Sequence, residues 1–211
     1  MPRRTSPAVS WPLAPDLQAR AAGFSRPAGV DEAGCGPWAG PVVAAAVVLR
    51  GFPIPVRIDD SKRLTRIQRE QAYQVILECA DIGIGIVCAR LIDQHNILQA
   101  RLLAMRHAIQ DLSHPPDLVL VDGRHAPQLP VPCWLLVDGD RRSRTIACAS
   151  IIAKVIRDQL MSFYHRLDPR YGFDQHKGYG TAWHAKQLGI HGPSLFHRMS
   201  FRPVFNLSHV S

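Results

Sequence analysis

The chain has 211 residues, a length that suits one domain, and 46% of them are hydrophobic, which is ordinary for a folded core. The 25 Lys and Arg residues outnumber the 17 Asp and Glu residues, giving a formal charge of +8 and a pI near 9.7. This charge favours a polyanionic partner, nucleic acid ahead of an anionic membrane, but does not by itself define a site.

Several classes of protein are excluded by what the sequence lacks. Its five cysteines are scattered without a C-x-x-C pair, so neither a disulfide framework nor a zinc site is expected. Free thiols indicate a reducing compartment, and we expect a cytoplasmic protein. The longest apolar run, residues 39–49, is far shorter than the roughly 20 residues of a membrane span. Prolines interrupt the segment behind Arg3 and Arg4, so a signal peptide is not expected.

Residues 1–26 are rich in Pro, Ala and Arg without periodicity, and we expect them to form a flexible tail. Strand-like and helix-like segments alternate after it. The patterns predict strands at 29–32, 42–49, 82–89, 118–121 and 133–137, and helices at 65–79, 93–112, 143–167 and 181–189. Thr65, Asp93 and Thr181 are the expected helix caps, and Thr65 with Gln68 matches a capping box.

This order of elements predicts an α/β fold with a mixed sheet flanked by helices. The first two strands are joined by a short connection, which favours antiparallel pairing, whereas helices separate the later strands and favour parallel pairing. A dinucleotide-binding fold is a poor fit, because no G-x-G-x-x-G opens a helix after the first strand. Gly34-Cys35-Gly36 leads instead into Pro37 and a second strand.

Four acids stand where predicted strands finish: Asp31, Glu32, Asp122 and Asp140. Burying a carboxylate costs free energy unless it is paired or binds a cation, and ligand sites in α/β sheets gather at the carboxyl ends of strands. Oxygen ligands without a His or Cys pattern suit Mg²⁺ or Mn²⁺. A basic protein with an acidic metal centre suggests a nuclease.

Two observations weaken this interpretation when it stands alone. A single Asp at a strand end is more often a solvated turn or cap residue. Adjacent residues of a regular strand also face opposite sides of the sheet, so Asp31 and Glu32 share one site only if the strand bends. Gly34 and Gly36 make such a bend feasible.

The segment GVDEAGCGPWAGPVVAAAVVL, residues 29–49, strongly resembles the opening signature of bacterial ribonuclease HII. Further motifs that resemble this family follow in order: DDSKRLT (59–65), NILQARLLAM (96–105), LVDG (120–123), GD followed by ASIIAKVIRD (139–158), HKGYGT (176–181) and GPSLFHRMSF (192–201). The resemblance therefore covers residues 29–204 and leaves only the two tails outside.

The resemblance implies a ribonuclease H-like fold with a C-terminal helical segment, a catalytic domain over residues 27–205 and a short tail at 206–211. It implies an endonuclease that hydrolyses the RNA strand of RNA–DNA hybrids and cuts at single ribonucleotides embedded in duplex DNA. The products would carry a 3′-hydroxyl and a 5′-phosphate. We expect a monomer that has these nucleic acids as its partners and does not bind membranes.

The resemblance also assigns the acids. Asp31, Glu32 and Asp122 would hold Mn²⁺ or Mg²⁺, with two ions present during catalysis, and Asp140 would be a further ligand or an acid–base group. Asp138 competes for this last role because it lies two residues earlier, but the glycine–acid step of the family falls on Gly139-Asp140, so Asp140 is preferred.

Substrate contacts are implied for five residues: Gly34, Cys35, Gly36, Lys62 and Tyr179. The glycine loop would approach the sugar–phosphate at the RNA–DNA junction, where a 2′-hydroxyl distinguishes RNA from DNA. Lys62 would contact a phosphate, and Tyr179 would pack on the deoxyribose beside the ribonucleotide. The simpler alternatives are a solvated lysine and an ordinary half-buried tyrosine.

Cys35 departs from the family, whose loop usually reads Gly-Arg-Gly. A cation that can pair with phosphate is missing, so recognition of isolated ribonucleotides is expected to be weaker, and Cys35→Arg is expected to strengthen it. Alternatively, one of Arg141, Arg142 and Arg144 supplies the missing contact. A metal-binding or redox role for Cys35 is disfavoured, because no partner Cys or His motif is near it.

Two other functions are compatible with part of this pattern. A resolvase-type nuclease of the same fold would share the carboxylates but not the HKGY and DSK motifs. A non-catalytic nucleic-acid-binding protein would keep the fold but would not need all four acids. Cleavage of a duplex with one ribonucleotide, cleavage of branched DNA, and binding without cleavage distinguish the three.

Overall fold

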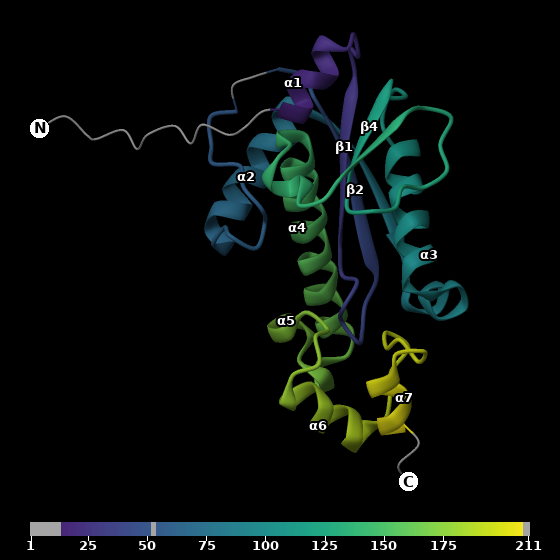
Figure 1. Ribbon diagram of the computed structural model, residues 1–211. Coiled ribbons are helices and arrows are strands. Elements are labelled where there is room, and N and C mark those ends of the chain that lie inside the picture. Colours follow the sequence, from purple (N-terminus) through teal and green to yellow (C-terminus); the bar gives the residue numbers. More distant parts are fainter. Residues whose placement is uncertain (1–13, 52–53, 209–211) are drawn as a thin grey trace, which may run out of the picture.

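The computed structural model describes residues 14–51 and 54–208. At its centre is a five-stranded mixed sheet with the strand order β3-β2-β1-β4-β5 (Figure 1). Its strands are β1 (Pro27–Ala33), β2 (Val42–Leu49), β3 (Ala80–Val87), β4 (Leu118–Asp122) and β5 (Cys133–Leu136). β1, β2 and β3 pair antiparallel, whereas β4 pairs parallel with both β1 and β5. The prediction of a mixed sheet is confirmed.

Helices cover both faces of this sheet (Figure 1). α3 (Ala89–Gln110) packs on one face, and α2 (Arg66–Cys79) with α4 (Arg144–Leu167) packs on the other. Every residue of β2 is buried, which explains why its sequence is a continuous apolar run without alternation. A Cβ atom at Gly85 would lie 1.9 Å from the Ala104 carbonyl oxygen, so glycine in β3 allows α3 to pack directly on the strand.

The predicted cap at Thr65 is confirmed, since Thr65 and Gln68 form both hydrogen bonds of a capping box. The predicted cap at Asp93 is wrong. α3 begins at Ala89 and is interrupted at Asn96, which has a φ of 66° and accepts hydrogen bonds from the amides of the following turn. The Asp93 carboxylate instead accepts the amides of Met199 and Ser200. A contact so distant in sequence leaves no local pattern.

The prediction of a flexible N-terminal tail is wrong for residues 14–26, while residues 1–13 lie outside the described residues. α1 (Ala14–Ala21) is a helix held by the buried carboxylate of Asp16. This carboxylate accepts the backbone amides of Arg144 and Thr145 and the hydroxyls of Ser143 and Thr145. A carboxylate at a helix N-terminus satisfies unpaired amides and interacts favourably with the helix dipole, so α1 is anchored to the first turn of α4.

The predicted C-terminal helical segment is present at one end of the sheet (Figure 1). It consists of η2 (Pro169–Tyr171), α5 (Phe173–His176), α6 (Ala182–His191) and α7 (Arg202–Ser208). α6 continues through Gly189, which was expected to end it, and stops before Gly192, whose φ is 68°. α7 extends to Ser208, so the predicted tail at 206–211 is wrong for its first three residues, and 209–211 lie outside the described residues.

The segment has a small apolar core of its own, formed by buried residues of the β1–β2 connection, α4 and the C-terminal helices: Ala39, Met161, Tyr171, Phe173, Leu188 and Val204. This core fixes the segment to the loop that follows β1. In the described part of the chain, no helix has the length and apolarity needed to cross a membrane.

The role of Asp16 can be tested by Asp16→Ala. Removing the carboxylate leaves buried amides and hydroxyls at the start of α4 without their acceptor, so the free energy of unfolding should fall by about 1–2 kcal/mol. Urea unfolding followed by circular dichroism measures this loss. Glu78→Ala, which removes an exposed carboxylate, is the matched control and should change the free energy by less than about 0.5 kcal/mol. Equal stability of the two variants would contradict the anchoring role.

Candidate active site

The four predicted acids lie at adjoining strand ends. β1 pairs with β4 so that Val30 is opposite Val121, which places Asp31 next to Asp122 at the end of β4. Asp140 belongs to the short helix η1 (Gly139–Arg141). The Gly139 amide donates a 2.7 Å hydrogen bond to Asp122 Oδ1 and ties this short helix to β4. The topology thus gathers acids from three separate segments.

Asp31 and Glu32 lie on opposite faces of β1, as strand geometry requires. The Asp31 carboxylate is buried on the α4 side, where it accepts a hydrogen bond from Ser150. The Glu32 side chain is only 13% exposed and lies on the α3 side, with Oε1 3.4 Å from Arg101 Nε. Because both are close to the end of β1 and Asp122 lies beside them, the two faces still contribute to one site.

Three of the acids, Asp31, Glu32 and Asp140, have a raised pKa. Burial raises the pKa of Asp31 well above its usual value, and the charges of Glu32 and Asp122 raise it further. The pKa of Asp140 rises to about 6 through burial and the nearby charges of Asp60 and Asp122. Burial also raises the pKa of Glu32. The site is therefore a cluster of partly desolvated carboxylates that repel one another.

This cluster fits a divalent cation. Glu32 Oε2 is buried and has no hydrogen-bond partner in the described part of the chain, which is costly for a carboxylate oxygen unless a cation is its partner. The acids offer oxygen ligands alone, the set that Mg²⁺ and Mn²⁺ prefer. Within the ranges 14–51 and 54–208, no three His, Cys, Asp or Glu side chains are already arranged as a metal-ligand group.

The structure separates Asp140 from its competitor Asp138. Asp140 is 6% exposed and interacts with the other acids, whereas Asp138 is exposed and adopts a left-handed conformation with a φ of 53°. The placement therefore favours Asp140, in agreement with the position of the glycine–acid step.

The five residues with predicted substrate contacts all line one cleft of about 320 Å³ together with Glu32. Its walls also contain residues that the sequence did not single out: Ala33, Ser61, Ser150, Lys154 and Arg157. Tyr179 is half exposed, with one ring carbon 3.8 Å from where a Cβ of Gly36 would be. The glycine loop and the tyrosine therefore face each other across the same opening.

Lys62 extends toward the acids. Burial alone would lower its pKa, but the charges of Asp60, Asp140, Asp31 and Asp122 outweigh burial and raise it, so the ammonium stays charged. Asp60, a buried residue of the DSK motif, accepts the Lys62 amide at 3.0 Å and is one acid that the sequence interpretation missed.

A fully buried arginine, Arg198, holds the backbone of the glycine loop, residues 34–36. Its three donor nitrogens reach the carbonyl oxygens of Gly34 at 2.6 Å, Cys35 at 3.0 Å and Gly40 at 2.9 Å. Burial, and then the charge of Arg157, lowers its pKa to about 9. Since each hydrogen bond goes to a backbone carbonyl, this guanidinium fixes the course of the loop.

A second buried arginine, Arg157 of α4, acts in the same way on the other side of the loop. It donates to the carbonyls of Ala39 and Pro41 at 3.2 and 3.0 Å, and to that of Lys177 at 3.0 Å. A Cβ at Gly34, whose φ is +100°, would lie 2.1 Å from Arg157 Nε, so this position requires glycine. The loop is thus joined to the segment that carries Tyr179.

A chain of neutral histidines holds Tyr179. The Tyr179 carbonyl can only accept, so His184 Nδ1 donates to it at 2.8 Å, and His184 Nε2 must then accept from His197 Nε2 at 3.0 Å. His197 Nδ1 in turn accepts the Ser194 amide at 2.9 Å. Each nitrogen has one fixed role, so protonation of either imidazole would break the chain.

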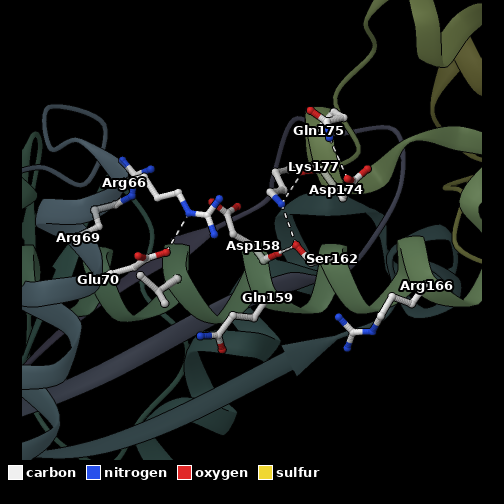
Figure 2. Close-up of a pocket in the computed structure, with 11 residues that line it drawn as sticks. Arg66, Arg69, Glu70, Asp158, Gln159, Ser162, Arg166, Asp174, Gln175 and Lys177 are labelled. Atoms are coloured by element: carbon white, nitrogen blue, oxygen red, sulfur yellow. Dashed lines mark hydrogen bonds and ion pairs between the residues drawn. The ribbon is translucent and has the colours of Figure 1, made fainter.

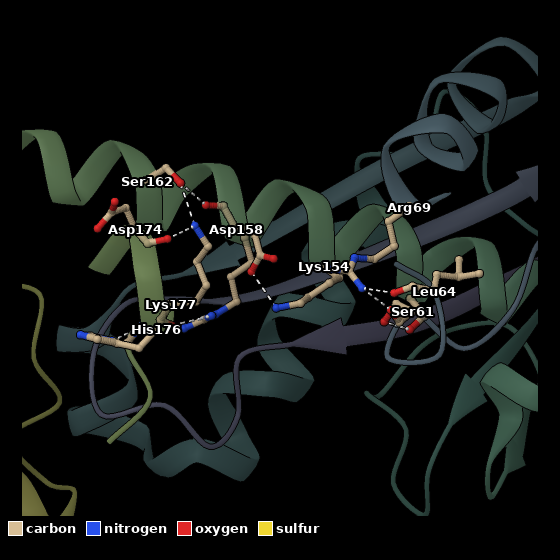
Figure 3. Close-up of polar contacts among 12 residues, drawn as sticks. Ser61, Leu64, Arg69, Lys154, Asp158, Ser162, Asp174, His176 and Lys177 are labelled. Atoms are coloured by element: carbon tan, nitrogen blue, oxygen red, sulfur yellow. Dashed lines mark hydrogen bonds and ion pairs between the residues drawn. The ribbon is translucent and has the colours of Figure 1, made fainter. Parts of the chain in front are cut away.

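A larger hollow of about 670 Å³ borders the cleft along α4 (Figure 2). The Lys154–Asp158 ion pair separates them, since Lys154 lines the cleft and Asp158 lines the hollow. Most cations here have internal partners, as Figure 3 shows: Arg69 donates to the Ser61 and Leu64 carbonyls, and Lys177 to Ser162 and the Asp174 carbonyl. Arg69 thus fixes α2 to the loop before it, and Lys177 joins α4 to α5.

Residues 28–204 match the family model of ribonuclease HII. The chain is 50% identical over 189 residues to ribonuclease HII of Chlamydia muridarum, with 89% of this chain and 87% of the relative covered. It is 49% identical over 190 residues to ribonuclease HII of Agrobacterium fabrum, with coverage of 90% and 88%.

Solved structures share the fold. Ribonuclease H2 from Pyrococcus horikoshii OT3 superposes with a TM-score of 0.73 at 22% identity, over 87% of this chain and 97% of that one. Bst-RNase HIII in complex with Mn²⁺ gives a TM-score of 0.65 at 16% identity, over 90% and 71% of the two chains.

An α/β sheet of this topology with acids at its adjoining strand ends defines a nuclease with the ribonuclease H fold. The chain belongs to the ribonuclease HII family. It is an endonuclease that acts on the RNA of RNA–DNA hybrids, and its family depends on divalent metal. The alternatives of a resolvase-type nuclease and of a non-catalytic binding protein are set aside by this membership.

The histidine chain predicts a pH dependence of stability. Burial lowers the pKa of His184 and of His197 to about 4, below the usual 6.5. The unfolded chain therefore takes up protons first as the pH falls, and the stability present above pH 6.5 is lost progressively down to about pH 4. Between pH 7 and 5, the free energy of unfolding of the wild type should fall by about 1–3 kcal/mol more than that of His184→Gln/His197→Gln.

Urea unfolding at pH 7, 6 and 5 measures this difference. His107→Gln, which removes an exposed histidine, is the control and should keep the wild-type pH dependence. Parallel curves for the wild type and the double variant would show that the two imidazoles are not held neutral.

Proposed function

We propose that Asp31, Glu32 and Asp122 hold two divalent ions, Mn²⁺ or Mg²⁺, and that Asp140 completes the centre as a further ligand or an acid–base group. The single observation that carries this proposal is the unsatisfied, buried Glu32 Oε2 within a cluster of mutually repelling carboxylates. Bst-RNase HIII, which has the same fold, was solved with Mn²⁺ and supports the choice of metal.

The ions would activate water and stabilise the leaving oxygen during displacement at the phosphodiester, giving a 3′-hydroxyl and a 5′-phosphate. The residues of the chain orient the reaction. Asp31 and Asp122 are held by the amides of Glu32 and Gly139, so their free oxygens have fixed directions. Asp140 is buried beside these acids, where it can act as a further ligand or exchange a proton.

We further propose that the enzyme cuts at single ribonucleotides in duplex DNA, with contacts from Gly34, Cys35, Gly36, Lys62 and Tyr179. The fixed glycine loop lets backbone groups approach the ribose 2′-hydroxyl. Tyr179 offers an exposed ring for the adjacent sugar, and Lys62 offers a charged ammonium for a phosphate. All five lie in the cleft that contains Glu32, which supports a common substrate.

Three further proposals concern the protein as a whole. The catalytic domain contains residues 27–205, in keeping with the family match over 28–204, and extends to α1 and to the end of α7. The enzyme acts as a monomer, because all four acids and the cleft come from one chain. It acts in the cytoplasm, which the free thiols of its five cysteines support.

Metal dependence is tested by removal of the ion and of its ligands. EDTA should abolish cleavage of an RNA–DNA hybrid, and Asp122→Asn or Asp140→Asn should lower kcat by at least about 100-fold while the protein stays folded. Asn at position 122 keeps the shape of the side chain and the acceptor oxygen for the Gly139 amide, so a loss of activity would result from the missing negative charge. Asp138→Asn is the matched control and should keep near-normal activity. A folded Asp122→Asn variant with wild-type turnover would refute the assignment.

The role of Lys62 is tested by binding. Because a phosphate contact releases counterions, Lys62→Ala should weaken binding to hybrid and plain duplex alike and should make the slope of log K against log salt shallower by about one unit. Fluorescence anisotropy in EDTA at several salt concentrations measures both. Lys186→Ala, an exposed lysine outside the cleft, is the control. An unchanged slope for Lys62→Ala would remove Lys62 from the interface.

A further inference from the structure

The cation that is missing at position 35 leaves a neutral thiol beside a buried acid. Cys35 Sγ lies 3.4 Å from Glu32 Oε1, and the side chain packs against the apolar layer between the sheet and α3. Position 35 therefore directs its side chain toward α3, and any residue that replaces the missing charge has to be found on that side.

Arg101 of α3 occupies this place. Its Nε lies 3.4 Å from the same Glu32 Oε1 that Cys35 contacts. Its Nη2 lies 3.0 Å from where a Cβ of Gly123 would be, so the guanidinium extends from Glu32 to the backbone just after Asp122. The side chain is 21% exposed, and its Nε is buried beside Glu32, so a ligand would have to meet the terminal Nη atoms. The guanidinium thus stands at the edge of the carboxylate cluster, beside the loop.

The other arginines near the site are engaged elsewhere. Arg141 pairs with Asp60 at 3.3 Å, and Arg142 reaches the Val137 carbonyl. Arg157 and Arg198 are buried and use their donors on backbone carbonyls. Arg141 and Arg142, two of the three arginines expected to replace the loop arginine, therefore make their contacts elsewhere, whereas Arg101 contacts the acid that Cys35 contacts.

We propose that Arg101 supplies the cation that binds the backbone phosphate at the RNA–DNA junction, so that the charge has moved from the loop to α3. The proposal rests on the proposed recognition of single ribonucleotides. A guanidinium is suited to this task, because its planar donors make charge-assisted, bidentate bonds to phosphate oxygens. Its position beside Glu32 places that phosphate next to the reacting centre.

This assignment reverses the expectation for Cys35→Arg. An arginine at position 35 would place a second guanidinium against Arg101 and Glu32, where one already stands. Like charges at this distance repel each other, so the substitution alone should give no gain. In a variant that lacks Arg101, the same substitution should raise kcat/KM. Residues 35 and 101 therefore form a coupled pair whose effects do not add.

The experiment compares the wild type, Arg101→Gln, Cys35→Arg and the double variant on duplex DNA with one ribonucleotide and on a continuous hybrid. Arg101→Gln should lower kcat/KM on the single-ribonucleotide duplex by about 10- to 100-fold, the usual effect of losing a charged hydrogen bond. The loss on the continuous hybrid should be smaller, because the enzyme can bind the hybrid at many positions. Cys35→Arg should give no gain, and the double variant should return to within a few-fold of the wild type. Arg106→Gln, an exposed arginine on the same helix, should match the wild type.

Binding in EDTA gives a readout that does not depend on cleavage. Arg101→Gln should weaken binding of the single-ribonucleotide duplex and make the salt slope shallower by about one unit, and Arg106→Gln should do neither. Unchanged binding and activity in folded Arg101→Gln would overturn the proposal. A double variant as weak as Arg101→Gln would also overturn it, because Arg101 would then act only on Glu32. Failure of the wild type to cut the single-ribonucleotide duplex would instead reject the proposed function, while binding still decides the role of Arg101.

Discussion

Repulsion among buried carboxylates is the constraint on which this structure depends. Burial and neighbouring acidic charges raise the pKa of Asp31, Glu32 and Asp140, and Glu32 Oε2 has no hydrogen-bond partner among the described residues. An arrangement that costs this much free energy persists only because the surrounding fold imposes it. Parallel pairing of β1 and β4 places two strand ends side by side, and the hydrogen bond from the Gly139 amide to Asp122 brings the third segment to them. A bound cation would turn the repulsion into attraction.

The basic residues around this centre fall into two groups with different tasks. Arg157 and Arg198 are buried and direct their donors to carbonyl oxygens, so they shape the glycine loop and join it to the segment of Tyr179. Lys62 and Arg101 are partly exposed and lie near the acids, and these two are proposed to bind phosphate. The net charge of the chain indicated a polyanionic partner but could not distinguish the buried cations that shape the loop from the exposed cations proposed to bind phosphate.

Much of the fold was predictable, because it follows from local patterns. The apolar run at 42–49 predicted a buried strand, and Thr65 with Gln68 predicted the start of α2. The errors arose where a distant contact decides the local structure. Asp16 orders α1 through the start of α4, and Asp93 binds the amides of residues 199 and 200 instead of capping a helix. No periodicity or capping pattern contains such information.

The candidate site was only partly predictable from local sequence patterns. The acids at strand ends follow from the pattern of strands, but the choice of Asp140 over Asp138 came from the family resemblance. The structure favours it through burial. The residues 34–36, 62 and 179 also came from the resemblance and lie in one cleft. Arg101, Arg157 and Arg198 were missed as site residues, because a sequence does not reveal which arginines are buried or which acid they approach.

The central claim, that this carboxylate cluster is a cation site, is tested most directly by thermal unfolding of the wild type and Asp31→Asn near pH 8, in EDTA and in saturating Mn²⁺. In EDTA, Asp31→Asn should unfold at a higher temperature than the wild type, because one of the repelling charges is gone. Mn²⁺ should raise the unfolding temperature of the wild type by several degrees and that of the variant much less, since a ligand that binds the folded state stabilises it. Equal stabilisation of the two proteins by Mn²⁺ would contradict the account.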